Sequence, residues 1–236
     1  MTRRLVIRPL PTAVALILFV VGIAAGNWQQ GRAHQKEDLQ RRMDQLDREA
    51  AIAVGSEPLP AATLEYRHVT AHGRWQPEHL VFLDNKARRG TPGYHVLMPL
   101  RIEGSAMHVL VNRGWVAAPH DRSRLPEIAA PTTGVTISGE ARIPGARFLE
   151  LSGQYAEGRL WQNLTPERYQ QWSKLQLQPF VILQTSAADD GLVREWDRPD
   201  LGIDKHRGYA FQWYALSALV AVFFVILSMR KERNEA

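Results

Sequence analysis

The sequence predicts a membrane protein in which two transmembrane helices bracket an extracytoplasmic α+β domain, mainly antiparallel β and small-barrel-like. Two observations predict the spans: residues 10–26 and residues 209–229 are apolar and contain no charged side chain. A third predicts the domain, because short alternating or β-branched runs between the spans are separated by Gly, Pro and Asn clusters. The chain of 236 residues contains no cysteine, which excludes disulfide frameworks, thiolate metal sites and cysteine nucleophiles.

The two spans differ in how clearly the sequence defines them. Residues 209–229 are long enough for a transmembrane helix, and Gln212 is their only strongly polar side chain. Residues 10–26 are at the short end of this range and also fit a cleaved signal peptide, since basic residues precede them and small residues end them. We favour a retained helix, because no clean small-x-small cleavage site stands out and a helical pattern continues beyond residue 26.

The basic residues predict the orientation of the chain. The net charge is +5, yet residues 27–208 are close to neutral, and the excess positive charge flanks the spans: Arg3, Arg4 and Arg8 on one side, Arg230, Lys231 and Arg233 on the other. Cytoplasmic flanks of transmembrane helices are enriched in such residues. We therefore expect cytoplasmic termini (1–9 and 230–236), a periplasmic domain (27–208), and a multi-pass protein of a bacterial inner (plasma) membrane. The pattern predicts a lipid bilayer as partner and no nucleic acid.

Hydrophobic spacing places the elements of the domain. Residues 29–50 continue the first span as a helix, with Leu39, Met43, Leu46 and Ala50 on one face, closed by prolines at 58 and 60. A second helix begins with Thr165 as N-cap and runs to about residue 177. The predicted strands are 66–75, 80–85, 94–102, 107–116, 135–143 and 180–185.

No catalytic constellation is found, so the sequence predicts a protein that is not an enzyme and has no catalytic residues. His68 and His72 share a strand face but lie about 13 Å apart, too far to hold one ion. There is no H-E-x-x-H or G-x-S-x-G motif, and Asp189-Asp190 is typical of a polar turn. Asn112-Arg113-Gly114-Trp115 is interpreted as a strand end with a Gly kink, a packed Trp115 and a solvated Arg113.

The start of the second span is the most informative stretch. His206, Tyr209 and Trp213 are spaced i, i+3 and i+7, which places them on one helical face if the helix begins a turn before the span. Such a site would suit a heme: His206 could ligate the iron, the two aromatic rings cover the macrocycle, and Lys205 and Arg207 pair with the propionates. Alternatively, all five residues are ordinary interfacial anchors.

The chain resembles the surfeit locus protein 1 family of cytochrome oxidase assembly factors nearly from end to end. The resemblance is carried by Gly26-Asn27-Trp28-Gln29, by Gly73-Arg74-Trp75, by Val111-Asn112-Arg113-Gly114-Trp115 and by His206…Tyr209…Trp213-Tyr214. Family members often carry Asn near this histidine, where the present chain has Asp204-Lys205.

The resemblance implies a chaperone, not an enzyme, that assists insertion of heme a into the catalytic subunit of a heme-copper oxidase. It implies that His206 matches the family's heme-binding histidine and that heme a is bound transiently. The oxidase catalytic subunit is then the expected partner, with heme a synthase as a further candidate. A membrane-anchored scaffold that holds an oxidase subunit without binding heme is the alternative. The lack of catalytic motifs disfavours an anchored enzyme or solute-binding domain.

Overall fold

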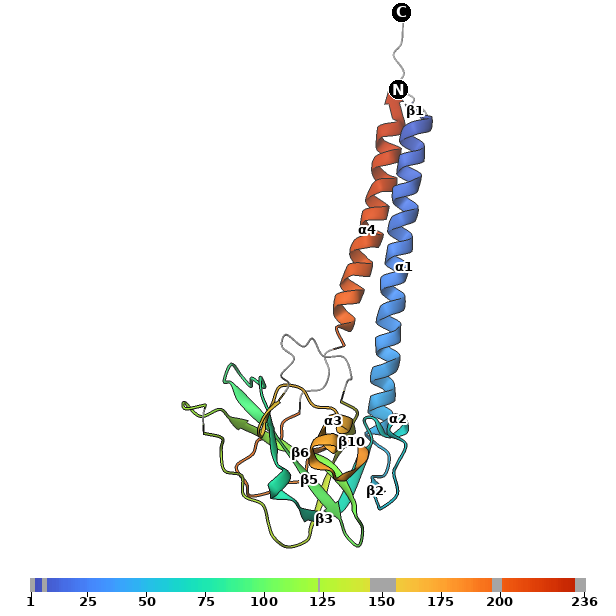
Figure 1. Ribbon diagram of the computed structural model, residues 1–236. Helices are drawn as coiled ribbons and strands as arrows, with labels where there is room; N and C mark the ends of the chain where they lie inside the picture. Colours follow the sequence, from blue (N-terminus) through green and yellow to red (C-terminus); the bar gives the residue numbers. More distant parts are fainter. Residues whose placement is uncertain (1–2, 6–7, 123, 145–155, 197–200, 232–236) are drawn as a thin grey trace, which may run out of the picture. The chain divides into compact units, whose positions relative to one another are not determined.

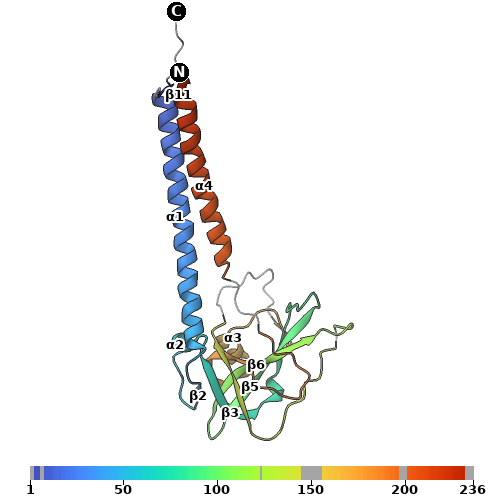
Figure 2. The same ribbon diagram turned by 180° about the vertical axis from the view of Figure 1, so that it is seen from behind.

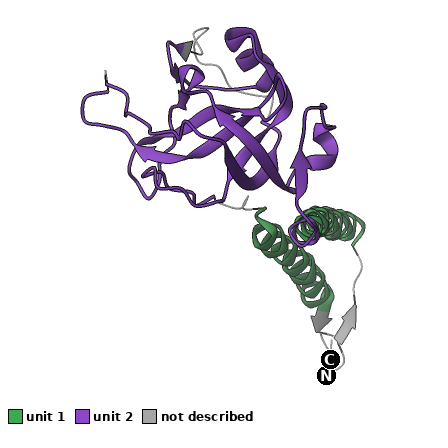
Figure 3. Ribbon diagram, turned by 90° about the horizontal axis from the view of Figure 1, so that it is seen from below, with its two compact units in different colours: residues 1–43, 199–236 green, residues 44–198 purple. Residues whose placement is uncertain are grey.

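The computed structural model describes residues 3–5, 8–122, 124–144, 156–196 and 201–231. The chain divides into two compact units, one formed by residues 1–43 with 199–236 and the other by residues 44–198 (Figure 3).

The first unit is a pair of long helices that lie side by side in both views (Figures 1 and 2). Helix α1 spans Pro9–Leu46 and helix α4 spans Ile203–Ser228, 38 and 26 residues respectively. At about 1.5 Å per residue, each exceeds the roughly 30 Å of a bilayer's hydrocarbon core. Both are long and apolar enough to cross a membrane by length and composition. The short strands β1 (Arg3–Leu5) and β11 (Met229–Lys231) pair antiparallel in this unit.

Helix α1 confirms that the first predicted span continues as a helix well beyond residue 26. The helix ends at Leu46, earlier than the predicted residue 50, so Ala50 lies outside it. The prolines at 58 and 60 therefore do not terminate it, since they lie well downstream of its end. A helix of this length extends some 25 Å past a bilayer core. The first unit therefore carries helical surface that a membrane alone would not cover.

The second unit is built on a five-stranded barrel, which confirms the predicted fold class. Its strands are β3 (His68–Trp75), β5 (Gly93–Ile102), β6 (Met107–Ala117), β7 (Val135–Arg142) and β10 (Gln176–Gln184). They pair in the order β3-β7-β10-β6-β5, and an additional β3–β5 pairing closes the barrel. All these pairings are antiparallel except β6–β10. This strand order is that of the Greek-key OB-fold barrel, a fold that serves many functions.

Smaller elements extend the sheet and cover the barrel. β2 (Ile52–Val54) pairs with β3, and β4 (Val81–Leu83) pairs with β5 and continues the sheet to β9 (Leu160–Trp161) and β8 (Ala156–Glu157). The helices are α2 (Ala61–Leu64), the 3₁₀ turn η1 (Pro77–His79) and α3 (Pro166–Ser173). All six predicted strands are confirmed as β3, β4, β5, β6, β7 and β10. The short strands β2, β8 and β9 were not predicted.

Strand alternation places apolar side chains on both faces of the sheet. On β6, Val109 and Val111 belong to the larger core cluster with the barrel residues, whereas Leu110 packs in a second cluster with Trp161 and Tyr169. Because successive strand residues point to opposite faces, one strand can serve both cores. These two cores explain why Val109, Leu110 and Val111 form an uninterrupted apolar run on β6 in place of an apolar–polar alternation.

The predicted helix after Thr165 is correct at its start and too long at its end. The Thr165 hydroxyl accepts a hydrogen bond from the Arg168 N–H at 3.2 Å, as expected of an N-cap. Helix α3 ends at Ser173, because Lys174 adopts a left-handed φ of 60° that terminates the helix. Residues from Gln176 onward then join β10, where Leu177 packs in the second core cluster.

Candidate functional site

The residues predicted to bind heme lie on the first turns of α4. Gly202 precedes the helix with a φ of 60°, in the left-handed region that glycine adopts without strain. The helix begins at Ile203, six residues before Tyr209, so the predicted early start of this helix is confirmed. Asp204 in the first turn places a negative charge near the positive end of the helix dipole.

His206 contacts the other helix of its unit. Its Nδ1 lies 2.7 Å from Oε1 of Gln29, which belongs to α1 and to the Gly26-Asn27-Trp28-Gln29 segment. An amide oxygen only accepts hydrogen bonds, so in this arrangement Nδ1 donates. The ring is half-buried, and its other nitrogen, Nε2, has no hydrogen-bond partner among the residues that the structure describes. Gln29 lies in one of the segments that carry the family resemblance, but no sequence signal connects it with His206, 177 positions away.

The two basic neighbours of His206 are both exposed. Arg207 forms an ion pair with Glu37 of α1, its Nη2 lying 2.8 Å from Oε1. A guanidinium has five N–H donors, so this pair leaves donors for a second anionic group. The structure thus brings His206 and Arg207 against the same helix, α1.

Tyr209 and Trp213 have large exposed surfaces, 54% and 37% of their maximum. They lie on α4 one and two turns after His206, but no ring contact joins either of them to His206 among the described residues. On the face toward α1, the helix instead presents Ala210 and Ser217, which are almost fully buried. The two aromatic rings therefore form an apolar exposed surface beside the His206 contact, not a closed pocket around it.

Close packing of two glycines brings the helices together. A Cβ atom on Gly22 would lie 2.1 Å from the Ser217 Oγ, and one on Gly26 would lie 2.4 Å from the Tyr214 ring. Glycines four residues apart let helix backbones approach closely in membranes. Beyond them, the Tyr214 hydroxyl donates to Oδ1 of Asn27 at 2.8 Å. The G-x-x-x-G spacing of Gly22 and Gly26 in the first span is the sequence signal that could have predicted this contact.

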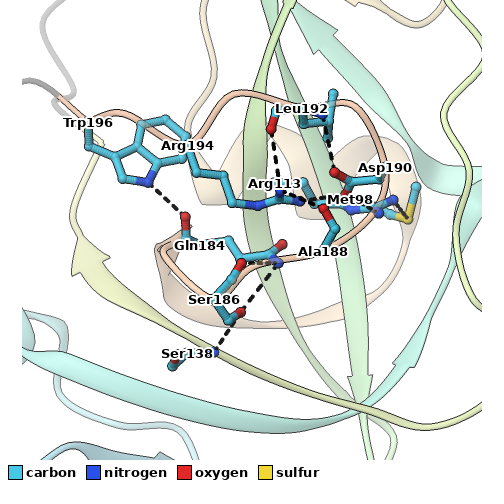
Figure 4. Close-up of polar contacts among 10 residues, drawn as sticks. All are labelled: Met98, Arg113, Ser138, Gln184, Ser186, Ala188, Asp190, Leu192, Arg194 and Trp196. Atoms are coloured by element: carbon cyan, nitrogen blue, oxygen red, sulfur yellow. Dashed lines mark hydrogen bonds and ion pairs between the residues drawn. The ribbon is translucent and has the colours of Figure 1, made fainter.

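A buried charged network lies in the barrel unit and corrects the prediction of a solvated Arg113 (Figure 4). The Arg113 side chain is only 1% exposed, and its Nη2 lies 2.7 Å from Oδ2 of Asp190. Arg194 donates to the same carboxylate oxygen, and the guanidinium of Arg113 stacks 4.7 Å from the Trp75 ring centre. Burial lowers the pKa of Arg113, and the Asp190 carboxylate opposes this shift. Asp190 does lie in a polar turn, where its Oδ1 accepts a hydrogen bond from the Leu192 N–H at 3.2 Å, and it is in addition a buried ion-pair partner.

A β-bulge turns Arg113 into the barrel. Val96 pairs with Gly114 and Leu97 pairs with Asn112, so Arg113 is the extra residue on β6. Gly114 has a φ of 148°, which accommodates the bulge. Bulges re-aim side chains and are common at barrel rims. The predicted glycine kink is thus correct, and its consequence is burial of the arginine.

The histidines of the barrel unit do not gather into a metal site. Among the residues that the structure describes, no three His, Asp or Glu side chains form a group that could hold a metal ion. His95 lies with its Nδ1 3.2 Å from Nδ2 of Asn112 and its ring 5.5 Å from that of Trp196. Burial, helped by the charge of Lys86, lowers the pKa of His95 to about 4. This histidine is therefore neutral over the physiological pH range.

Comparison with known proteins places these features in a family. The family model described as "SURF1 family" matches residues 16–218, which include most of both helices and the whole barrel. A SURF1-like protein from Monosiga brevicollis is 26% identical over 235 residues, an alignment that covers 92% of this chain and 87% of that protein. The SURF1 family is one of cytochrome oxidase assembly factors and not of enzymes. With two helices able to cross a membrane joined to a five-stranded barrel, and a family match over most of its length, this chain belongs to the SURF1 family.

Proposed function

We propose that this chain assists insertion of heme a into the catalytic subunit of a heme-copper oxidase and carries the heme transiently on His206. The observation that supports this most directly is the geometry of the imidazole: Nδ1 is engaged by Gln29, and Nε2 has no partner among the described residues. A neutral imidazole with one free nitrogen is the usual axial ligand of heme iron. Heme a is cargo in this proposal, bound by the protein and passed on.

The neighbouring side chains have the chemistry that such cargo needs. Tyr209 and Trp213 offer exposed aromatic surface to cover an apolar macrocycle. Lys205 and Arg207 are cations for the two propionates, and Arg207 is already oriented by Glu37. We assign Lys205, Arg207, Tyr209 and Trp213 to heme binding, and His206 to the iron.

Both helices are retained in this proposal, with cytoplasmic termini and the barrel in the periplasm of a bacterium. The packing of Gly22 and Gly26 against α4 supports a retained first helix, since a cleaved signal peptide would leave Ser217 and Tyr214 without these neighbours. Reporter fusions after Glu65 and at Ala236 test the orientation. A cytoplasmic signal from the first fusion, or a mature chain beginning near Asn27, would contradict it.

Optical titration of the purified full-length chain with heme a tests the binding role. We expect His206→Ala to abolish the heme absorbance of the complex, and His34→Ala, at an exposed histidine of α1, to leave it intact. Lys205→Ala and Arg207→Ala should weaken binding without moving the absorption bands, because a propionate partner does not alter the ligand field of the iron. Full binding by His206→Ala would show that His206 is only an interfacial anchor, and a wild-type chain that binds no heme a would favour the scaffold that holds an oxidase subunit without heme.

The role in oxidase assembly is tested in cells. Deleting the gene should lower heme-copper oxidase activity through incomplete heme a loading, while heme a synthesis continues. Affinity purification of the chain should recover the oxidase catalytic subunit, and heme a synthase as the source of the cargo. Normal oxidase activity and heme content in the deletion strain, with no second copy of the gene, would refute the proposal.

A further inference from the structure

Starting from the proposed role of His206 as an iron ligand, we propose that Gln29 is a positioning residue that selects the ligating nitrogen of His206. The Gln29 Oε1 to His206 Nδ1 distance of 2.7 Å is that of a good hydrogen bond. Because the amide oxygen can only accept, it holds the imidazole proton on Nδ1. A neutral imidazole carries a single ring proton, so Nε2 keeps its lone pair for iron.

The position of Gln29 is fixed by contacts on either side of it. Two residues before Gln29 on α1, Asn27 accepts a hydrogen bond from the Tyr214 hydroxyl at 2.8 Å. Eight residues after Gln29, Glu37 forms an ion pair with Arg207, also at 2.8 Å. Gly26 lets α4 approach at this level, since any side chain there would meet the Tyr214 ring. The pairing of the two helices thus holds the half-buried amide of Gln29 within hydrogen-bond distance of His206.

A hydrogen-bond acceptor on the non-ligating nitrogen has two consequences for a metal-binding histidine. It fixes the tautomer and the ring orientation, and it makes the ligating nitrogen more basic. Loss of such a partner typically weakens metal affinity about 10- to 100-fold. Gln29 would therefore set how tightly heme is held without touching the heme itself, which suits cargo that must later be released.

The tautomer can be measured without heme. In full-length protein in detergent, ¹⁵N spectra of labelled imidazoles, with His206→Ala used for assignment, should show a protonated Nδ1 and an unprotonated Nε2 on His206. Gln29→Leu should shift the population toward the Nε2-protonated tautomer. Gln30→Leu is the matched control, because Gln30 is the adjacent glutamine and faces His34 of its own helix at 3.4 Å. A protonated Nε2 in the wild-type protein would overturn the inference.

Heme a titration of the same variants separates the inference from the proposed function. We expect about 10- to 100-fold weaker binding in Gln29→Leu, little change in Gln30→Leu, and retained binding in Gln29→Glu, whose carboxylate also accepts from Nδ1. If His206→Ala abolishes binding and Gln29→Leu does not weaken it, the inference is wrong and the proposed function stands. If His206→Ala binds normally, the proposed function fails, while the tautomer measurement still decides the role of Gln29. A disulfide between cysteines placed at Gly22 and Ser217 checks that the helices remain paired in each variant.

Discussion

Replacing Asp190 by alanine should destabilise the barrel far more than replacing an exposed glutamate that also pairs with two arginines. Asp190 is 3% exposed and faces Arg113, which is 1% exposed, so the substitution leaves a guanidinium buried without its counter-ion. Breaking a buried ion pair from one side costs about 3–5 kcal/mol. Glu195 is 65% exposed and pairs with Arg88 and Arg89, so Glu195→Ala should cost less than about 1 kcal/mol.

The difference can be measured by denaturant unfolding of the full-length protein in detergent, followed by tryptophan fluorescence. Five tryptophans lie within the barrel unit and report on its unfolding: Trp75, Trp115, Trp161, Trp172 and Trp196. Thermal melts should show the same order, with a midpoint lower by roughly 6–20 °C for Asp190→Ala, at about 2–4 °C per kcal/mol. Equal losses for Asp190→Ala and Glu195→Ala would refute the reasoning.

A second substitution shows whether the loss of stability in Asp190→Ala comes from the unpaired charge of Arg113 or from the loop contacts that Asp190 makes. If Asp190→Ala loses stability because the buried Arg113 charge has no counter-ion, adding Arg113→Met to the same chain should recover part of that stability. The unbranched methionine keeps contact with the apolar surroundings of Trp75 and Met98 and brings no charge. No recovery in the double variant would assign the loss to the loop backbone that Asp190 holds, and not to the buried charge.

Three further outcomes are expected. Cysteines at Gly22 and Ser217 should form a disulfide in this otherwise cysteine-free chain, because a Cβ on Gly22 would lie 3.4 Å from that of Ser217. After proteolysis of the barrel unit, the two helix fragments should stay linked until reductant is added. Gln178→Leu should lower the free energy of unfolding by at least about 2 kcal/mol, because the buried amide forms hydrogen bonds with three backbone groups of the Gly55–Leu59 loop. The control Gln176→Leu, at an exposed position, should lower it by less than about 0.5 kcal/mol. Stability should fall as the pH drops from 6.5 to about 4, because His95 stays neutral in the folded chain while the unfolded chain takes up a proton, and His95→Gln should flatten the free energy of unfolding in this window.

The regular elements of this protein could be predicted because their signals are local. Alternating or β-branched runs marked the barrel strands, and the cap formed by Thr165 and Pro166 marked the start of α3. The end of α3 was misplaced because Leu175 and Leu177 continue an apolar pattern that fits a helix as well as a strand. Only the left-handed turn at Lys174 and packing against the second core decide between the two.

The contacts of Arg113 and of His206 join residues far apart in the chain, and hydrophobic periodicity predicts local structure but not such long-range contacts. Arg113 and Asp190 are 77 positions apart, and the bulge that buries the arginine depends on the register of β5 against β6. Gln29 and His206 are 177 positions apart and meet only because two glycines let the helices approach. Spacing and family resemblance predicted His206 as an iron ligand, whereas its contact with Gln29 depends on the pairing of α1 with α4 and has no local signal.

This long separation orders events during biosynthesis. A ribosome that adds about 5–20 residues per second needs roughly 9–35 s to travel from Gln29 to His206. During that interval α1 already exists, while the barrel is still being made and crossing the membrane in the proposed topology. A nascent chain therefore carries the acceptor long before it carries the imidazole. If His206 binds heme as proposed, loading must wait until α4 has been synthesised, because α4 carries the nitrogen that would receive the iron.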